Sequence, residues 1–215
     1  MENGEQKMNK IDIQNWNRKE HFEFFSKMKS PFLGITANVK ITSGYQKVKE
    51  NKYSLFAYYL HSSMKAVNSI REFKYRIIDN EVFELEKINA GSTILREDKT
   101  FGFIYVEFDE DFNIFNNRLK SEINEVKISS GLRLNNEDIK TDLIRHTTIP
   151  WVSFTSLLHP THFNNTDSVP KISFGKIFES DKEMFLPVSV EAHHGLIDGY
   201  HIGEYFRMFE EILNL

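Results

Sequence analysis

Hydrophobic residues recur along this chain with two spacings, one typical of helices and one typical of strands. Apolar positions three and four residues apart predict helices over residues 18–28, 55–70, 109–127 and 200–213. Asn17 is the expected N-cap of the first helix, because a short polar side chain can bind the free backbone N–H groups there. Alternation of apolar and polar positions, rich in β-branched residues, predicts strands over residues 32–42, 73–78, 82–87, 92–95, 101–108, 144–155, 171–178 and 184–192. Asp79 and Asn80 separate two of these strands and predict a two-residue hairpin turn, because both residues tolerate a positive φ.

The polar segments between these elements divide into a surface loop and a candidate site. Residues 129–142 are polar and rich in turn-forming residues, which predicts a loop on the surface. Residues 158–169 are rich in His, Pro, Asn and Thr, which indicates either a connection or part of a site. No repeat, linker or change of composition marks a second domain. We therefore expect one domain over residues 1–215, with residues 1–7 as a flexible extension.

The composition of the chain narrows the classes of function it can have. The 27 Lys and Arg residues against 31 Asp and Glu residues give a net charge of −4, which offers no basic surface for nucleic acid. The absence of Cys excludes disulfide scaffolds, thiolate nucleophiles, zinc fingers and iron–sulfur clusters. The 19 Phe, 8 Tyr and 2 Trp residues, against 10 Gly and 5 Pro, favour a packed globular domain. No apolar stretch suits a signal peptide or a membrane anchor, so we expect a cytoplasmic protein without a membrane partner.

The strongest candidate site is the segment His-His-Gly-Leu-Ile-Asp-Gly at residues 193–199, which follows an apolar strand and precedes a helix. The chain has no Cys and no Ser in a Gly-flanked nucleophile elbow, so His194 is the best candidate for the central catalytic group, as a general base. The ordinary pKa of an imidazole, about 6.5, lets it take up a proton near neutral pH and return it later. The two glycines allow the backbone to turn sharply beside it.

Other interpretations of the histidine pair must be weighed against catalysis. Neighbouring histidines in a strand point to opposite faces, and no third ligand follows at a suitable spacing, so we expect no metal. A structural histidine satisfied by hydrogen bonds is the commonest role of a single histidine, and the pattern alone does not choose between that role and catalysis. The remaining histidines lie in no such pattern and are expected to be structural or exposed: His21, His61, His146, His159, His162 and His201.

Three segments of the chain resemble the chloramphenicol acetyltransferase family. The segment at 193–201 is similar to the family signature His-His-x-x-x-Asp-Gly-Phe-His, near the C-terminus of a chain of similar length. The segment Asn-Trp-Asn-Arg-Lys-Glu-His-Phe-Glu-Phe at 15–24 resembles the N-terminal Asn-Trp-x-Arg-x-Glu-His-Phe-Glu segment of the family. Pro-Trp-Val-Ser-Phe-Thr at 150–155 is similar to its Pro-Trp-x-x-Phe segment. The three matches occur in the family's order and span the whole chain.

The resemblance implies a fold and an activity. The fold would be α+β, a two-layer sandwich in which a mixed β-sheet is covered by helices. The protein would be an acetyl-CoA-dependent O-acetyltransferase that acts as a homotrimer, with active sites at the subunit interfaces. Acetyl-CoA, as a co-substrate rather than a permanently bound cofactor, and a small hydroxyl acceptor would enter from opposite ends of a tunnel. The implied acceptor is chloramphenicol or a similar compound, which would make the protein an antibiotic-resistance enzyme.

The resemblance also implies catalytic roles for matching positions. His194 would deprotonate the acceptor hydroxyl as it attacks the thioester, and Asp198 would pair with Arg18 in a structural ion pair that holds the loop. Thr147 stands where the family has a Ser that donates a hydrogen bond to the tetrahedral oxyanion. Thr keeps the hydroxyl and adds a methyl group. Thr148 would take this role if the strand register differs.

Further matching positions would line the substrate sites. Lys176 matches a family Lys near the coenzyme, with an exposed, solvated Lys as the alternative. Phe103 stands where the chloramphenicol enzymes usually carry a small residue, and 157–159 (Leu-Leu-His) replaces a Phe-Asn/Asp-Leu stretch, so the pocket would be tighter. The residues assigned to the acceptor pocket are Phe24, Phe25, Phe101, Phe103, Leu157, His159 and Ser173, the last of which matches a family Thr.

Two other functions fit part of this pattern. Lipoamide acyltransferases share a His-x-x-x-Asp-Gly motif and a trimeric core, but they usually have Asp-His at that point and follow lipoyl domains that this chain lacks. A non-catalytic homologue that only binds a small molecule would explain the aromatic pocket and the Thr at the oxyanion position. The intact His194, Asp198 and Arg18 argue against loss of turnover.

Overall fold

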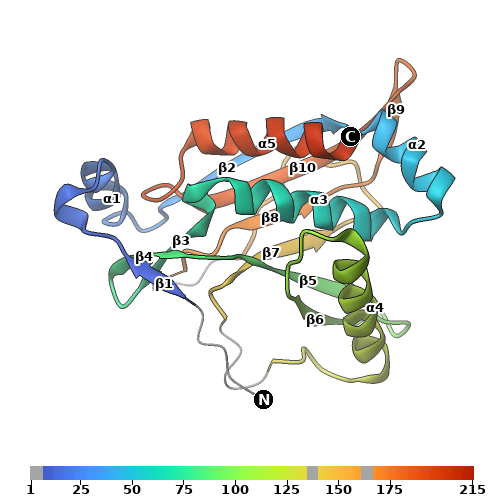
Figure 1. The fold of residues 1–215 in the computed structure, drawn as a ribbon, viewed down its shortest axis with the longest axis horizontal. Coiled ribbons are helices and arrows are strands. Elements are labelled where there is room, and N and C mark those ends of the chain that lie inside the picture. Colours follow the sequence, from blue (N-terminus) through green and yellow to red (C-terminus); the bar gives the residue numbers. More distant parts are fainter. Residues whose placement is uncertain (1–6, 135–139, 161–166) are drawn as a thin grey trace.

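A mixed sheet of seven strands forms the centre of the molecule (Figure 1). The computed structural model describes residues 7–134, 140–160 and 167–215. The strands follow the order β2-β10-β8-β7-β5-β6, and β9 pairs with one end of β10. Pairing is parallel between β5 and β7 and between β7 and β8, and antiparallel elsewhere. The strands are β2 (Phe32–Lys40), β5 (Asn89–Leu95), β6 (Phe101–Val106), β7 (Leu143–Thr148), β8 (Lys171–Phe174), β9 (Phe178–Ser180) and β10 (Glu183–His193).

A second, smaller sheet lies beside the first and has the order β1-β4-β3, from Met8–Lys10, Glu81–Leu85 and Tyr75–Ile78. The hairpin between β3 and β4 turns at Asp79 and Asn80, whose φ angles of 50° and 63° confirm the predicted two-residue turn. Of the expected flexible extension, residues 1–6 lie outside the described residues. Lys7 is tied down, because its carbonyl accepts a hydrogen bond from the Glu86 amide.

Helices cover one face of the large sheet. Figure 1 shows α3 and α5 running side by side in front of the strands, with α4 beside the edge formed by β5 and β6. In the described part of the chain, no helix has the length and apolarity needed to span a membrane. The helices are α1 (Lys19–Phe25), α2 (Thr42–Asn51), α3 (Leu55–Ser69), α4 (Phe112–Ile128) and α5 (Gly199–Asn214), with single 3-10 turns at Ile13–Asn15 and Arg71–Lys74. The predicted α+β class is confirmed.

Strand β10 organises both faces of the sheet. Leu186, Val188 and Val190 alternate along it and are fully buried beneath the helices. The intervening side chains, Ser189 and Glu191 among them, point to the opposite face, which no helix of the described residues covers. Polar groups gathered on that open face are therefore positioned by a strand that is paired on both sides, by β2 and β8.

The two outermost strands leave edges of different kinds. On β6, the Phe103 amide donates to the Leu132 carbonyl, so the segment after α4 covers part of that edge. Strand β2 pairs with β10 on one side only, and its other side carries no strand among the described residues. Most of its side chains are half-buried rather than exposed.

Several predicted boundaries are wrong for identifiable reasons. The first helix begins at Lys19 after Arg18, and Asn17 makes no cap there. The strand predicted over 144–155 ends at Thr148, just before Pro150, and the one over 171–178 breaks after Phe174. Helix α2 was not predicted. Its first amides, at 43 and 44, are bound by the side chain of Asn214, at the far end of the chain.

Truncation of Phe209, fully buried on α5 against Phe174 and Tyr205, should lower the free energy of unfolding by about 3–5 kcal/mol, because it removes ring contacts and leaves a cavity. Urea denaturation of Phe209→Ala measures the loss. Ile128→Ala, at an exposed position on α4, is the control and should change stability by less than about 0.5 kcal/mol. Equal effects of the two substitutions would show that α5 is not part of the core.

Candidate active site

The histidine motif forms a tight turn at the end of β10. The carbonyl of His193 accepts hydrogen bonds from the amides of Leu196 and Ile197, at 2.9 and 3.0 Å. The Gly195 amide donates to Nδ1 of His193, and a Cβ at Gly195 would lie only 3.0 Å from the His193 ring and 3.2 Å from the Phe22 backbone. A side chain at position 195 would therefore have to displace the His193 ring or the Phe22 backbone, so glycine suits the close packing of this turn against α1.

His193 serves this turn and is not free to act as a base. Its side chain is buried, and its Nδ1 accepts the Gly195 hydrogen bond. Burial lowers the pKa of His193 to about 4, so the ring is neutral at physiological pH. Of the two neighbouring histidines, this one has the structural role.

His194 is held differently, at the rim of the site. Its amide donates to the Pro31 carbonyl at 2.7 Å, and its half-buried ring stacks on Phe25 with centroids 3.9 Å apart. Its Nδ1 is buried without a hydrogen-bond partner in the described structure, so this nitrogen faces the protein. Phe24 packs edge-on against Phe25 and is largely exposed. The predicted base and two of the predicted pocket aromatics thus lie together.

The ion pair predicted between Arg18 and Asp198 is present. Nη1 of Arg18 lies 2.8 Å from Oδ2 of Asp198, and the arginine side chain is buried. Asp198 also begins α5, where its side chain accepts from the Tyr200 amide and its own amide donates to Nδ1 of His201. Burial opposes ionisation of Asp198, but Arg18 and the other donors outweigh it and keep its pKa below the usual value. One carboxylate therefore fixes the turn, the helix start and the chain before α1.

The predicted oxyanion donor belongs to a row of hydroxyls on the open face of the sheet. Thr147 is opposite Ser173, Ser173 is opposite Ser189, and Ser189 is opposite Thr36, whose hydroxyl lies 3.0 Å away. Thr148 points the other way and shares a hydrogen bond with the Tyr59 hydroxyl under the helices. The strand register therefore presents Thr147, rather than Thr148, on the open face.

The other predicted pocket residues lie on or beside this open face. His159 sits above Ser173, with Nε2 at 2.8 Å from the hydroxyl, and Leu157 is half-buried nearby in sequence. Phe101 and Phe103 pack edge to face on β6 and are partly exposed. Lys176 is exposed, its backbone amide donates to the Val152 carbonyl, and its carbonyl accepts from the Ser153 hydroxyl. An exposed side chain at this position fits both interpretations, a solvated surface lysine and a contact to the coenzyme.

Thr147 and His194 do not meet within one chain. His194 is five residues beyond Ser189 on β10, and Thr147 is two strands away across the sheet. At about 3.4 Å per residue and about 4.8 Å per strand, their backbones are about 20 Å apart. The predicted site residues of a single chain therefore fall into two separate groups, which we call half-sites: one around His194 and one around Thr147.

Sequence reasoning missed a set of charged side chains on the same open face. Lys171 and Glu191 are opposite each other on β8 and β10, with Nζ and Oε1 3.0 Å apart, and both are buried. Arg145 follows in the same row on β7 and pairs with Asp167. The available signal was a glutamate inside an apolar strand, two residues before the histidine pair.

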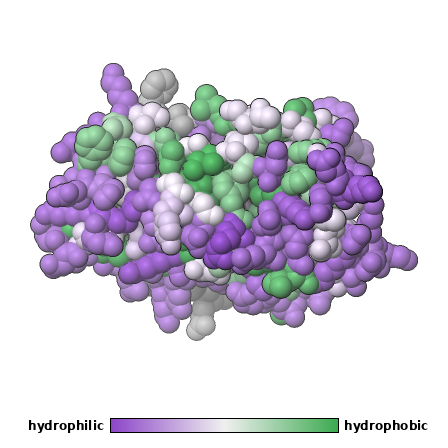
Figure 2. Space-filling model, turned by 90° about the horizontal axis from the view of Figure 1, so that it is seen from above, coloured by the Kyte–Doolittle hydropathy of each residue, from purple (hydrophilic) through white to green (hydrophobic). Residues whose placement is uncertain are grey.

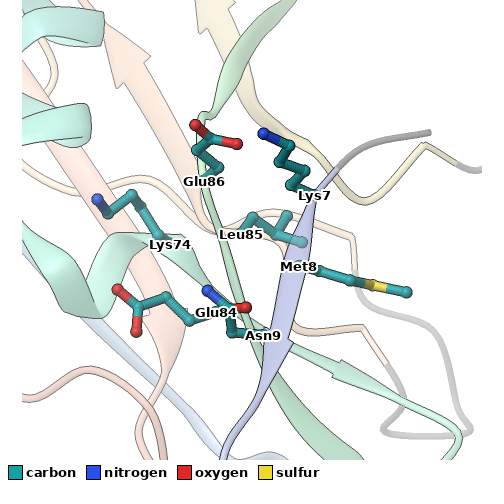
Figure 3. A pocket seen from close by; sticks show the side chains of 7 residues that line it. All are labelled: Lys7, Met8, Asn9, Lys74, Glu84, Leu85 and Glu86. Atoms are coloured by element: carbon teal, nitrogen blue, oxygen red, sulfur yellow. The ribbon is translucent and has the colours of Figure 1, made fainter. Parts of the chain in front are cut away.

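A surface pocket lies away from both half-sites. Its volume is about 530 Å³, and it is lined by Lys7, Met8, Asn9, Lys74, Glu84, Leu85 and Glu86. In Figure 3 these side chains come from the small sheet and the turn before β3, with lysines and glutamates around its mouth. It contains none of the predicted site residues. In the described ranges, no three His, Asp or Glu side chains are grouped as metal ligands would be.

Comparison with known proteins identifies the class and then the family. A solved chloramphenicol acetyltransferase superposes with a TM-score of 0.91 at 29% identity, covering 96% of this chain and 100% of that chain. The chloramphenicol acetyltransferase of Clostridium perfringens is 30% identical over 209 residues, which are 96% of this chain and 94% of the relative. The fold and the site thus define an acetyltransferase. The family model "Chloramphenicol acetyltransferase" matches residues 6–212, and the chain belongs to this family.

The lipoamide alternative is less well supported. A structure described as a probable dihydrolipoamide acetyltransferase from Listeria monocytogenes superposes with a TM-score of 0.65 at 14% identity, covering 98% of this chain and 94% of that chain. An identity this low shows a shared fold and no more.

Stability should depend on pH through two buried histidines. Burial lowers the pKa of both His193 and His146 to about 4, whereas an imidazole in the unfolded chain has a pKa of about 6.5. Between these values the unfolded state binds protons that the folded state does not, so the free energy of unfolding should fall as the pH is lowered from 6.5 towards 4. His193→Asn should reduce the loss between pH 7 and pH 4.5 by about 2 kcal/mol, measured by urea denaturation.

The control is His21→Asn, a substitution of an exposed histidine in α1. It should leave the pH dependence of unfolding unchanged. Parallel stability curves for the wild type and His193→Asn would contradict the assignment of His193 as a buried, neutral residue.

Proposed function

We propose that this protein transfers the acetyl group of acetyl-CoA to a hydroxyl of a small acceptor, with chloramphenicol or a similar compound as the acceptor class. The observation that carries the proposal is His194, held by the Pro31 carbonyl and Phe25 in a turn fixed by the Arg18–Asp198 pair. Family membership supports the same chemistry. The relatives named chloramphenicol acetyltransferases support the acceptor class.

In the proposed mechanism His194 acts as a general base. A proton on its buried Nδ1 leaves the lone pair on Nε2, which takes the proton of the acceptor hydroxyl as its oxygen attacks the thioester carbon. A C–O bond forms, and the carbonyl electrons move to oxygen in the tetrahedral intermediate. The intermediate then collapses, the C–S bond breaks, and the sulfur of CoA leaves with the proton returned by the imidazolium. Atoms and charges balance without any further reactant.

Thr147 is the proposed donor to the oxyanion. Its place in the hydroxyl row on the open face supports this role, since Thr148 is engaged with Tyr59 on the other face. A well-aimed donor of this kind contributes about 3–4 kcal/mol to stabilisation of the transition state.

The separation of the half-sites supports an active site shared between copies, and we propose a homotrimer. The Thr147 half of one copy would meet the His194 half of its neighbour, because about 20 Å separates them within a chain. Exposed apolar side chains accompany both halves, among them Phe24, Phe103 and Leu158. Figure 2 shows hydrophobic residues gathered in the middle of the face seen from above, surrounded by polar ones. Such a surface is suited to burial against another copy.

Acetyl-CoA is proposed as a co-substrate that is released as CoA in each turnover, with no permanently bound cofactor and no nucleic-acid or membrane partner. Lys176 is exposed beside the Thr147 half-site and is the proposed contact to the coenzyme. We place the reaction in the cytoplasm, because acetyl-CoA is an intracellular metabolite. Acetylation of chloramphenicol would make the protein an antibiotic-resistance enzyme. One domain over residues 1–215 would carry the whole activity.

Mixing two inactive variants tests the shared site. His194→Ala should lower kcat by about 10³-fold through loss of the base, and Thr147→Val by about 10²-fold or more through loss of the donor. Hybrid trimers made by co-expression should regain about one quarter of the wild-type activity, because random assembly leaves that share of sites with both residues intact. Thiol release from acetyl-CoA with chloramphenicol measures the activity, and sedimentation measures the assembly.

The control is co-expression of His194→Ala with His194→Asn, which should recover nothing. An active monomer, or no recovery in folded hybrid trimers of the first pair, would contradict the shared site. Wild-type protein that binds acceptors without thiol release would instead be a non-catalytic binder.

Phe103 tests the acceptor rather than the chemistry. If its ring crowds the acceptor pocket, Phe103→Ala should raise kcat/KM for chloramphenicol about tenfold, and the wild type should be a poor chloramphenicol acetylator. Steady-state kinetics with saturating acetyl-CoA make the comparison, after circular dichroism has shown that the variant is folded. Ile114→Ala, an exposed position on α4, is the control. Efficient wild-type turnover that the Phe103 truncation only weakens would show that Phe103 is an ordinary wall of a competent chloramphenicol pocket.

A further inference from the structure

A buried ion pair lies on the open face of the sheet between the hydroxyl row and His193. Nζ of Lys171 and Oε1 of Glu191 are 3.0 Å apart, and the two side chains are only 6% and 8% exposed. Burial works against the charged form of Glu191, but its interactions with His159 and Lys171 outweigh it and keep the pKa of the carboxyl below its usual value. Two charges placed this deep need a reason beyond stability, because an apolar pair of similar size would be cheaper to bury.

The pair is tied to the segment 157–160, which we call the acceptor wall because Leu157 and His159 belong to the proposed acceptor pocket. Nζ of Lys171 also donates to the Pro160 carbonyl at 3.3 Å. One residue earlier in the wall, Nε2 of His159 lies 2.8 Å from the Ser173 hydroxyl, two positions along β8 from Lys171. These two bonds fasten the end of the wall to β8, and Glu191 holds the ammonium group that makes one of them.

The order Ser173, His159 and Glu191 is also that of a hydrolytic triad, but the geometry does not suit a nucleophile. Ser173 is fully buried in the middle of a strand paired on both sides, beneath the imidazole. Nδ1 of His159 lies 3.7 Å from Oε2 of Glu191, too far for a hydrogen bond. A nucleophile must be accessible to its substrate, whereas side chains that only hold the acceptor wall in place can be buried, as all three of these groups are.

We propose that Lys171 and Glu191 are positioning residues that hold the acceptor wall in the shape required to bind the hydroxyl acceptor. This inference rests on the proposed acetyl transfer for its kinetic consequence, but not for its structural one. The ammonium bridges two elements, the wall through Pro160 and β10 through Glu191. Loss of the Glu191 charge leaves the buried Lys171 ammonium with only the longer contact to Asp167, whose Oδ2 lies 3.8 Å from Nζ, and loss of the Lys171 ammonium removes the bond to Pro160. Either change should free the wall while leaving His194, on the other half-site, in place.

The test compares Glu191→Gln, Lys171→Met and the double variant with the two residues exchanged, K171E/E191K. Glu183→Gln is the matched control, since it makes the same substitution at the opposite end of β10, in the partly exposed pair with Lys40. Hydrogen exchange of the peptide covering residues 150–160 reports on the wall without requiring activity. Steady-state kinetics with chloramphenicol give KM for the acceptor and for acetyl-CoA separately.

Glu191→Gln and Lys171→Met should each speed exchange in the 150–160 peptide at least tenfold and raise KM for the acceptor at least fivefold. KM for acetyl-CoA should stay within twofold, the exchanged pair should recover part of the loss, and Glu183→Gln should resemble the wild type. Unchanged exchange in folded single variants would overturn the proposal, and so would equal rises in both KM values. If the variants exchange faster but the wild type shows no acetyl transfer, the result supports the role of Lys171 and Glu191 in holding the acceptor wall. It refutes the proposed function instead.

Discussion

The ion pair between Arg18 and Asp198 is the contact on which the site depends most. It joins residues 180 positions apart, so that the segment leading into α1 and the turn leading into α5 form one unit. Together with the Pro31 carbonyl, which accepts from the His194 amide, this contact holds the α1 region against the motif turn, where Phe25 stacks on His194. The same carboxylate begins α5, whose packing on α3 completes the helix layer. The placement of His194 and the start of α5 therefore depend on the same ion pair. A substitution that removes it would disturb both.

The two faces of β10 have different roles in the molecule. One face supplies the apolar core under the helices, and the other carries hydroxyls and charges whose spacing is set by strand register. Register is a stiff constraint, because a slip of one residue would exchange the two faces completely. The rigid placement of Thr147 against Ser173 follows from this constraint and does not need a rigid loop.

The parts of the site that the residues predicted by themselves are encoded over a few consecutive positions, whereas the Arg18–Asp198 pair, 180 positions apart, was predicted only through the family resemblance. His194 and Asp198 lie in one turn, and the positive φ angles at Asp79 and Asn80 follow from their own side chains. The parts that the sequence did not predict depend on partners far away in the chain. Helix α2 buries only Gly44 and Val48, and its placement depends on the far end of the chain, because Gly44 packs against the backbone of Leu213 and Asn214 provides the cap. Lys171 looks like a surface residue, and Glu191 stands inside an apolar strand with no partner that the sequence identifies, until the strand pairing places the two together.

In the proposed trimer, the side of β2 that pairs with no strand among the described residues would give the newly made chain a limited time in which to assemble. A strand edge with half-buried apolar side chains can add to any other strand it meets, including the wrong one. A chain that folds correctly but stays alone therefore remains exposed to aggregation for as long as that edge is open. Yield of the functional protein would then be governed by chain concentration and by competition between correct docking and misassembly, even when each chain is stable on its own.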